Sequence, residues 1–135
     1  MLEKRLLLFL RFKSMENIEE FNNRRSKGNE LIYAQDFLPF KRFMALDGRA
    51  YSAGTIPSKY KELMGLVGSA VLRCNDCIYY HIEQCVREGA TRDEINEALN
   101  ISLVIGGSIV IPHLRFALQA LEEVFISNYK VQDEQ

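Results

Sequence analysis

The sequence has no long apolar run and almost no net charge. None of its apolar runs approaches the roughly 18 residues that a membrane-spanning helix needs. The 17 basic and 18 acidic residues give a net charge of −1, which leaves no positive field to attract nucleic acid or anionic lipid. We therefore expect no nucleic-acid partner and no membrane partner.

What is present is the composition of an ordinary folded protein. The chain has 135 residues, of which 47% are hydrophobic and 26% charged, which suits one domain with its own core. We expect an N-terminal extension of uncertain role over 1–14, a single all-helical domain over 15–131, and a polar tail over 132–135. The apolar run Leu6–Leu10 is too short for a signal-peptide core, and no small-residue cleavage site follows it.

The cysteines are few, odd in number and clustered. Cys74, Cys77 and Cys85 are the three in the chain, a poor disulfide framework for a secreted protein. The pattern is more typical of a reduced intracellular protein whose thiols do chemistry or hold a metal. We therefore expect a cytoplasmic location.

Most of the chain carries the helical period of apolar residues. Pro39 lies in the first turn of a helix that follows Asp36, where its missing N–H costs nothing. The expected landmarks are a polar helix from Ile18 through Ile32, the helix after Asp36, a loop over Gly48–Pro57, a helix opened by Pro57, a break near Cys74, a helix that ends at Gly89, and a last helix from about Pro112.

Several apolar stripes predict buried faces. The helix after Pro57 is apolar nearly all round, so we expect it to be buried. The aromatic stripe of the preceding helix should fill the core or a subunit contact. These stripes comprise Phe40, Phe43 and Met44; Tyr60, Leu63, Met64, Val67 and Val71; Ile95, Ala98, Leu99 and Ser102; and Leu114, Leu118, Leu121 and Phe125.

The segment Ser102–Ile111 is ambiguous. Two β-branched runs flank Gly106 and Gly107, which is typical of a hairpin. Against this, Thr91 and Glu94 form a capping box that starts a helix running directly into the segment, and a lone hairpin would lack sheet partners. We favour two helices broken at the glycines, and an all-α fold of roughly six to seven helices.

The stretch from Cys74 to His81 contains the candidate reactive residues. Cys77 and His81 are four residues apart and share a helix face. Cys74 lies one turn earlier, where two thiols can close a disulfide if the turn relaxes slightly. A helix N-terminus favours a thiolate, and a histidine can move the proton near neutral pH.

A carboxylate completes the set. If the helix after Pro57 and the cysteine helix pair antiparallel about a turn near Arg73, then Glu62 lies opposite residues 84 to 85. At about 1.5 Å rise per residue, that is within one turn of His81. The four residues Glu62, His81, Cys77 and Cys74 then form a proton chain that ends at the thiols.

The spacing Glu62-x11-Cys74-x2-Cys77-x3-His81 resembles the motif of the alkylhydroperoxidase D-like proteins in the carboxymuconolactone decarboxylase family. The resemblance extends from about Leu38 to Val124 and includes Lys61-Glu62-Leu63, the stretch 88–95, and Gly106-Gly107. It implies an alkylhydroperoxidase D-like helical bundle, homo-oligomers (often trimers or hexamers), and a dithiol that cycles with a disulfide.

By that likeness Cys74 and Cys77 are the redox pair, and Glu62 and His81 are the proton relay. The implied substrate is a small-molecule hydroperoxide, and the implied reductant is an unidentified thiol or protein. We expect no cofactor and no metal. Decarboxylase members of the family generally lack the cysteine pair, which argues against lactone decarboxylation.

Asp76 is a departure from the family pattern. Some peroxidase members carry a second histidine between the cysteines, where this chain has Asp76. A carboxylate there would oppose thiolate formation, unless it points outward and serves the helix N-terminus.

Two questions stay open in the sequence. The attacking thiol is Cys77 if His81 deprotonates it directly, or Cys74 if the helix terminus makes that residue the exposed attacker. The alternative functions are a protein disulfide reductase and a non-catalytic oligomeric module with inert thiols or a structural metal, such as a Cys2HisGlu zinc site. A thioredoxin fold is disfavoured because its βαβ context is absent.

The other titratable residues have simpler interpretations. We expect Cys85 to be a buried small hydrophobe and His113 to be a capping or interface residue. The pattern around Glu122 and Glu123 predicts a solvated helix face.

Overall fold

The computed structural model describes residues 2–11 and 15–133, and it is helical almost throughout. No strand occurs in these ranges, which confirms the all-α prediction. The helices are α1 (Leu2–Arg11), α2 (Ile18–Ala34), α3 (Leu38–Ala50), α4 (Ser58–Val71), α5 (Asn75–Arg87), α6 (Arg92–Gly106) and α7 (Ile111–Asp133), with the short 3-10 turn η1 (Ser108–Val110) before α7.

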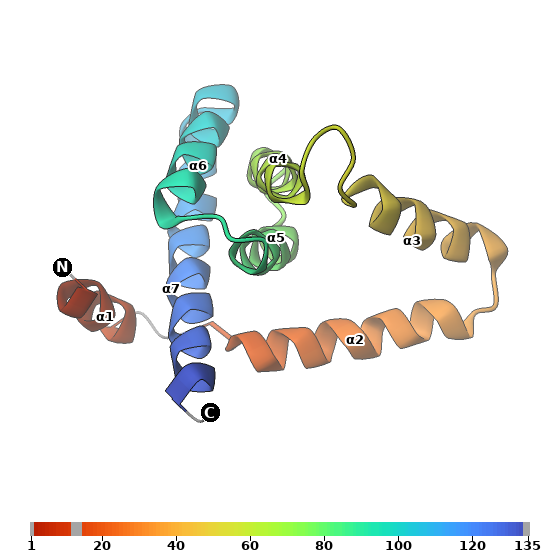
Figure 1. The fold of residues 1–135 in the computed structure, drawn as a ribbon, viewed down its shortest axis with the longest axis horizontal. Coiled ribbons are helices and arrows are strands. Elements are labelled where there is room, and N and C mark those ends of the chain that lie inside the picture. The colour runs from red at the N-terminus through yellow and green to blue at the C-terminus, as the bar shows by residue number, and fades with distance from the viewer. Residues whose placement is uncertain (1, 12–14, 134–135) are drawn as a thin grey trace.

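The long helix α7 and the pair α4–α5 form the centre of the molecule (Figure 1). Helix α4 packs on α5 and α6, and α5 packs on α7. Helices α2 and α3 extend away from this centre and fold back toward α4, while α1 lies across α7 from them. Phe9 is the buried residue of α1, so the N-terminal extension contains a helix that packs against α7.

Local signals set the helix ends as the sequence predicts. The Thr91 hydroxyl accepts the Glu94 N–H, and the Glu94 carboxylate accepts the Thr91 N–H, so the capping box is confirmed. Gly89 follows α5 with φ +83°, and Gly107 follows α6 with φ +76°. Glycine adopts these left-handed conformations without penalty. The break at Gly107 confirms two helices there, and the hairpin alternative is wrong.

The predicted inner face of α4 is wrong. Its buried residues are Glu62, Leu66, Ser69 and Ala70, whereas Met64 is 56% exposed. The helix has apolar residues on more than one side, and α5 and α6 cover the side that carries Leu66 and Ala70. A second apolar side of α4 therefore remains uncovered in the single chain.

The structure excludes one of the two alternatives for the α3 stripe, and it corrects the prediction for Glu122 and Glu123. Phe40 and Phe43 are exposed, so the α3 stripe does not fill the core of the chain. Glu123 is buried and Glu122 is half-buried, so neither is part of a solvated face. Donors from distant elements reach these carboxylates: the Arg92 Nη2 lies 2.9 Å from Glu122.

The remaining differences concern helix lengths. Helix α3 continues through Ala50, two residues beyond Gly48, the start of the predicted loop, and α7 continues to Asp133, into the predicted polar tail. Residues 134–135 of that tail lie outside the described part of the chain. Within 2–11 and 15–133, no helix has both the length and the apolar character to cross a bilayer.

Candidate functional site

A tight turn between α4 and α5 creates the site. Arg73 occupies the left-handed region there, with φ +61°, and Cys74 is the N-cap of α5. The turn folds α5 back along α4, as predicted from the sequence. Glu62, in the second turn of α4, therefore lies beside His81 in the middle of α5.

The two cysteines meet at the N-terminus of α5. Cys74 and Cys77 form a disulfide with their Cα atoms 5.3 Å apart. The Cys74 Sγ also accepts the backbone N–H of Cys77 at 3.3 Å. A sulfur at this position faces the free N–H groups and the positive end of the helix dipole, which favour a thiolate after reduction.

Glu62 and His81 form a buried pair, with His81 one helical turn after Cys77. The Glu62 Oε2 lies 2.7 Å from the His81 Nδ1, and both side chains are less than a tenth exposed. On the other side of the ring, the hydroxyl of Tyr51 lies 3.5 Å from Nε2. The imidazole is therefore held at both nitrogens, by an acid from α4 and by a phenol from the α3–α4 loop.

Gly65 makes room for this imidazole. A Cβ on Gly65 would lie 2.5 Å from Cε1 of His81 and 2.8 Å from each ring nitrogen. Such distances are too short for any side chain to be tolerated without movement. The ring thus packs directly against the backbone of α4, one turn after Glu62.

Cys77 and His81 line a common cavity of about 290 Å³, together with Tyr51 and Tyr80. Burial, followed by the charges of Asp47 and Glu62, raises the pKa of Tyr51, so its hydroxyl stays protonated and can donate. Cys77 is exposed and Cys74 is half-buried, so the structure does not make Cys74 the more exposed thiol. A second cavity of about 290 Å³, between α1 and α7, lies away from the cysteines.

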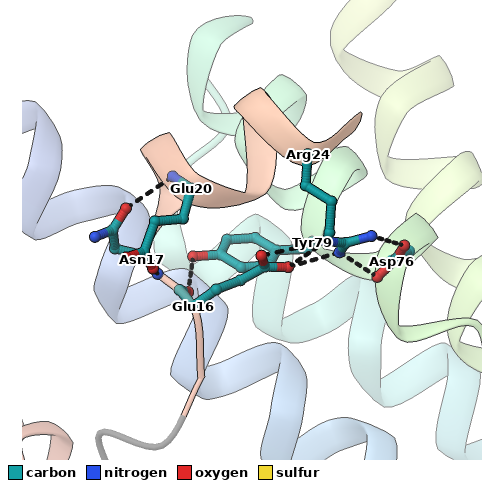
Figure 2. Close-up of polar contacts among 6 residues, drawn as sticks. All are labelled: Glu16, Asn17, Glu20, Arg24, Asp76 and Tyr79. Atoms are coloured by element: carbon teal, nitrogen blue, oxygen red, sulfur yellow. Dashed lines mark hydrogen bonds and ion pairs between the residues drawn. The ribbon is translucent and has the colours of Figure 1, made fainter. Parts of the chain in front are cut away.

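Asp76 lines the same cavity, and its side chain is 64% exposed and reaches toward α2 (Figure 2). Its carboxylate meets the guanidinium of Arg24, with Nη2 and Oδ1 3.0 Å apart (Figure 2). The outward orientation that the sequence left as a condition is therefore observed. The Asp76 carboxylate is paired with the Arg24 cation, and its negative charge near the cysteines is partly compensated.

The other titratable residues lie outside this group. Cys85 is fully buried and unpaired, and burial raises its pKa to about 12, in agreement with the prediction of a buried hydrophobe. His113 contacts Asn75, the first residue of α5, at 2.8 Å. Among the residues that the structure describes, no cluster of three His, Cys, Asp or Glu side chains is arranged to hold a metal ion.

Sequence reasoning missed Tyr51, Gly65 and Arg24. Tyr51 comes from a loop, where no periodicity marks it. Gly65 is a single glycine inside a helical pattern, which can signal a close approach but does not say to what. Arg24 belongs to a helix with many charged residues. In the sequence, none of these residues can be told apart from ordinary solvent-exposed ones.

The chain belongs to the carboxymuconolactone decarboxylase family, whose model matches residues 39–123. An uncharacterized protein of Cupriavidus necator is 32% identical over 79 residues, which are 58% of this chain and 67% of that protein. "Uncharacterized protein 4 in cox locus" of Paracoccus denitrificans is 29% identical over 82 residues, 61% of this chain and 74% of that protein.

Solved structures agree with this fold. Two crystal structures of a Thermotoga maritima protein are 51% and 50% identical, with TM-scores of 0.81 and 0.77. They cover 83% and 86% of this chain and 98% and 97% of theirs. One of them describes that protein as a family member with a possible involvement in antioxidative response. A Legionella pneumophila family protein, 24% identical with a TM-score of 0.73, covers 78% of this chain and 95% of its own, and shows the fold alone.

Proposed function

We propose that the protein is a thiol-dependent oxidoreductase that reduces hydroperoxides through a dithiol–disulfide cycle of Cys74 and Cys77. The observation that supports this most directly is the juxtaposition of the disulfide with the buried Glu62–His81 pair. Thiol chemistry that is coupled to proton transfer uses thiols whose pKa the surroundings can shift, and a buried acid–imidazole pair beside a cavity that substrate can enter. The antioxidative role suggested for the Thermotoga maritima relative agrees with this proposal.

The cycle begins with Cys77, which is exposed and lines the cavity with His81. Its thiolate attacks one oxygen of the hydroperoxide. An S–O bond forms, the O–O bond breaks, and the leaving alkoxide takes a proton to become an alcohol. The sulfenic acid on Cys77 then condenses with the thiol of Cys74, which releases water and forms the disulfide.

Glu62, His81 and Tyr51 carry out the proton transfers of this cycle. His81 accepts the thiol proton as the thiolate forms and returns it to the leaving oxygen. Glu62 fixes the ring orientation through Nδ1, and the Tyr51 hydroxyl contacts the other nitrogen from within the cavity. A reductant, either a small thiol or a protein in the cytoplasm, must then supply two electrons and two protons to reopen the disulfide.

The exposure of Cys77 also favours a second candidate, a disulfide reductase for a partner protein. In that reaction the thiolate attacks a partner's disulfide, and Cys74 resolves the mixed disulfide. Insulin reduction in the presence of dithiothreitol tests this activity separately from peroxide consumption.

The decisive experiment is a steady-state assay of tert-butyl hydroperoxide consumption with dithiothreitol as the reductant. We expect Cys74→Ser and Cys77→Ser each to abolish turnover. Cys85→Ala, which removes the buried third thiol, should retain it. Equal turnover in the wild type and the two serine variants would contradict the proposal.

We also propose that the chain forms a homo-oligomer, a trimer or hexamer as the family resemblance implies. Helix α3 has no buried residue, and one protomer exposes apolar side chains on three helices. They include Phe37, Phe40, Phe43 and Leu46 around α3, Tyr60 and Met64 on α4, and Ile101, Val104 and Ile105 on α6. Large exposed apolar patches commonly mark protein–protein interaction sites. Light scattering on the protein as it elutes from a size-exclusion column measures the mass of the assembly and so tests the proposal. Phe43→Lys should reduce that mass. A monomeric wild type would refute the proposal.

A further inference from the structure

An acidic residue lies inside the redox motif itself. Asp76 is the residue directly before Cys77 and lies within the first turn of α5. A carboxylate so close to two sulfurs repels the thiolate that the proposed function requires. Whatever offsets this charge therefore contributes to the reactivity of the dithiol.

Arg24 meets Asp76 with two parallel hydrogen bonds. Nη1 donates to Oδ2 at 3.1 Å and Nη2 donates to Oδ1 at 3.0 Å. The same guanidinium donates to Glu16, where Nη2 lies 2.6 Å from Oε1. Figure 2 shows the Arg24 side chain reaching from α2 across to Asp76 on α5, with Glu16 on its other side.

Helix α2 is fixed where this contact is made. Asn17 and Glu20 form a capping box at its start, and the Tyr79 hydroxyl donates to the Glu16 carbonyl at 3.0 Å. A row of side-chain pairs then follows along α2 and α5. The pairs are Phe21 stacked on Tyr79, Asn22 bonded to Glu83, Arg24 bonded to Asp76, and Arg25 over the ring of Tyr80.

The Arg24–Asp76 pair contributes little to stability. The two side chains are 52% and 64% exposed, and exposed ion pairs are worth little because water screens them. A two-point contact at the redox motif that adds so little to folding is better explained by its effect on the charge of Asp76.

We propose that Arg24 is a positioning residue of the dithiol, which holds the Asp76 carboxylate toward α2 through the two-point contact and so limits its repulsion of a thiolate. The inference rests on the proposed function, because a dithiol without redox chemistry has no need of a stable thiolate. The titratable side chains that line the Cys77 cavity are Arg25, Asp47, Tyr51, Asp76, Tyr80 and His81. Arg24 is the group whose removal changes the surroundings of Asp76 and leaves the other five in place.

The test measures thiolate formation without any peroxide. The reduced protein is alkylated with iodoacetamide over a range of pH, and mass spectrometry assigns the rate to each cysteine. An Asp76 carboxylate that Arg24 no longer holds, at roughly 6 Å from a thiol through water, would shift the pKa of that thiol by about half a unit. Arg24→Gln should therefore raise the apparent thiol pKa by about 0.5 and lower alkylation at neutral pH about threefold.

Matched variants separate the role of charge from that of structure. Arg24→Lys keeps the cation and should restore most of the alkylation rate. Glu16→Gln removes the other carboxylate that Arg24 holds, which lies outside the redox motif, and should change the rate less than Arg24→Gln does. Asp76→Asn should lower the thiol pKa, and adding Arg24→Gln to it should have a much smaller effect than in the wild type.

Two results would overturn the inference. One is an Arg24→Gln variant with the thiol pKa of the wild type. The other is an equal shift from Arg24→Gln with and without Asp76, which would mean that Arg24 acts on the sulfurs directly. Neither depends on turnover, so a protein that consumes no hydroperoxide refutes the proposed function and leaves this measurement interpretable.

Discussion

Gly65 and Gly68 lie three residues apart in α4 and should respond oppositely to substitution by alanine. Inside a helix this change ordinarily stabilises by about 1 kcal/mol, because glycine loses more conformational entropy on folding. A Cβ on Gly68 would have no atom within 4 Å, whereas a Cβ on Gly65 would lie 2.5 Å from the His81 ring. The two variants thus differ in one contact.

The magnitude follows from the distance that the ring must move. An ordinary contact begins at 3.4 Å, so Gly65→Ala must displace the imidazole by about 0.9 Å. That stretches the 2.7 Å bond to Glu62 beyond hydrogen-bonding range. Overpacking and the loss of a buried partner each cost about 1–3 kcal/mol. After the gain in helix propensity, we expect a net loss of about 1–5 kcal/mol.

Activity should fall further than stability suggests. A misplacement of about 1 Å at a reacting group costs on the order of a hundredfold in rate, so Gly65→Ala should show about 1% of the wild-type peroxide turnover. Unfolding in urea and the tert-butyl hydroperoxide assay measure the two effects. Gly68→Ala and Gly28→Ala, the latter in α2 with no atom near its Cβ position, are the controls and should be as stable as the wild type or more so. A Gly65→Ala variant with unchanged stability and turnover would refute the packing argument.

Three further predictions concern single groups. Glu62→Gln should slow peroxide turnover about a hundredfold, because it removes the acid that orients the imidazole; an unchanged rate would remove Glu62 from the relay. The hydrogen bond from Lys59, followed by that from the Thr91 backbone, lowers the pKa of Glu94 in the folded chain. The Glu94 carboxylate therefore stabilises the folded protein above its unfolded pKa, and this stabilisation is lost as the pH falls through its pKa in the folded protein. Glu94→Gln should make the free energy of unfolding fall less steeply on the acid side of a stability–pH curve. An unchanged slope on that side would contradict this prediction. With its pKa raised to about 12, Cys85 should resist alkylation at pH 8 until the protein is unfolded; rapid labelling of three thiols in the native, reduced protein would contradict its burial.

The sequence predicts best where neighbouring residues decide the outcome. The capping box at Thr91 and the helix end at Gly89 depend on contacts within four residues, and both are confirmed. The antiparallel pairing of α4 and α5 was predictable because the turn near Arg73 leaves little freedom, and it brought Glu62 to His81. These features require no knowledge of distant segments.

Predictions that depend on distant partners are less successful. Helix α4 offers apolar residues on two sides, and only the arrival of α5 and α6 decides that Leu66 is buried and Met64 exposed. Glu122 and Glu123 together resemble a charged, solvated helix face in the sequence, yet the Glu123 carboxylate is buried and accepts the N–H of Ile18 at 3.4 Å. Tyr51 belongs to the site because a loop carries it to His81, and no local pattern encodes that position.

The Glu62–His81 pair invites a last test, because it is an inefficient way to hold two helices together. Removing charged or polar groups from water costs free energy that their mutual attraction often fails to repay. A well-packed apolar pair at the same place is commonly as stable, or more stable by about 1–4 kcal/mol. If the pair only had to hold α4 and α5 together, two apolar side chains at these positions would be sufficient.

We therefore expect the double variant Glu62→Met with His81→Leu to be more stable than the single variant His81→Leu, since methionine adapts to irregular space and the single variant leaves a buried carboxylate without its partner. That single change should cost about 3–5 kcal/mol in urea unfolding. The double variant should recover most of this stability and none of the peroxide turnover. A double variant that is as unstable as the single one would assign the pair a structural role, and one that retains turnover would exclude it from the proton relay.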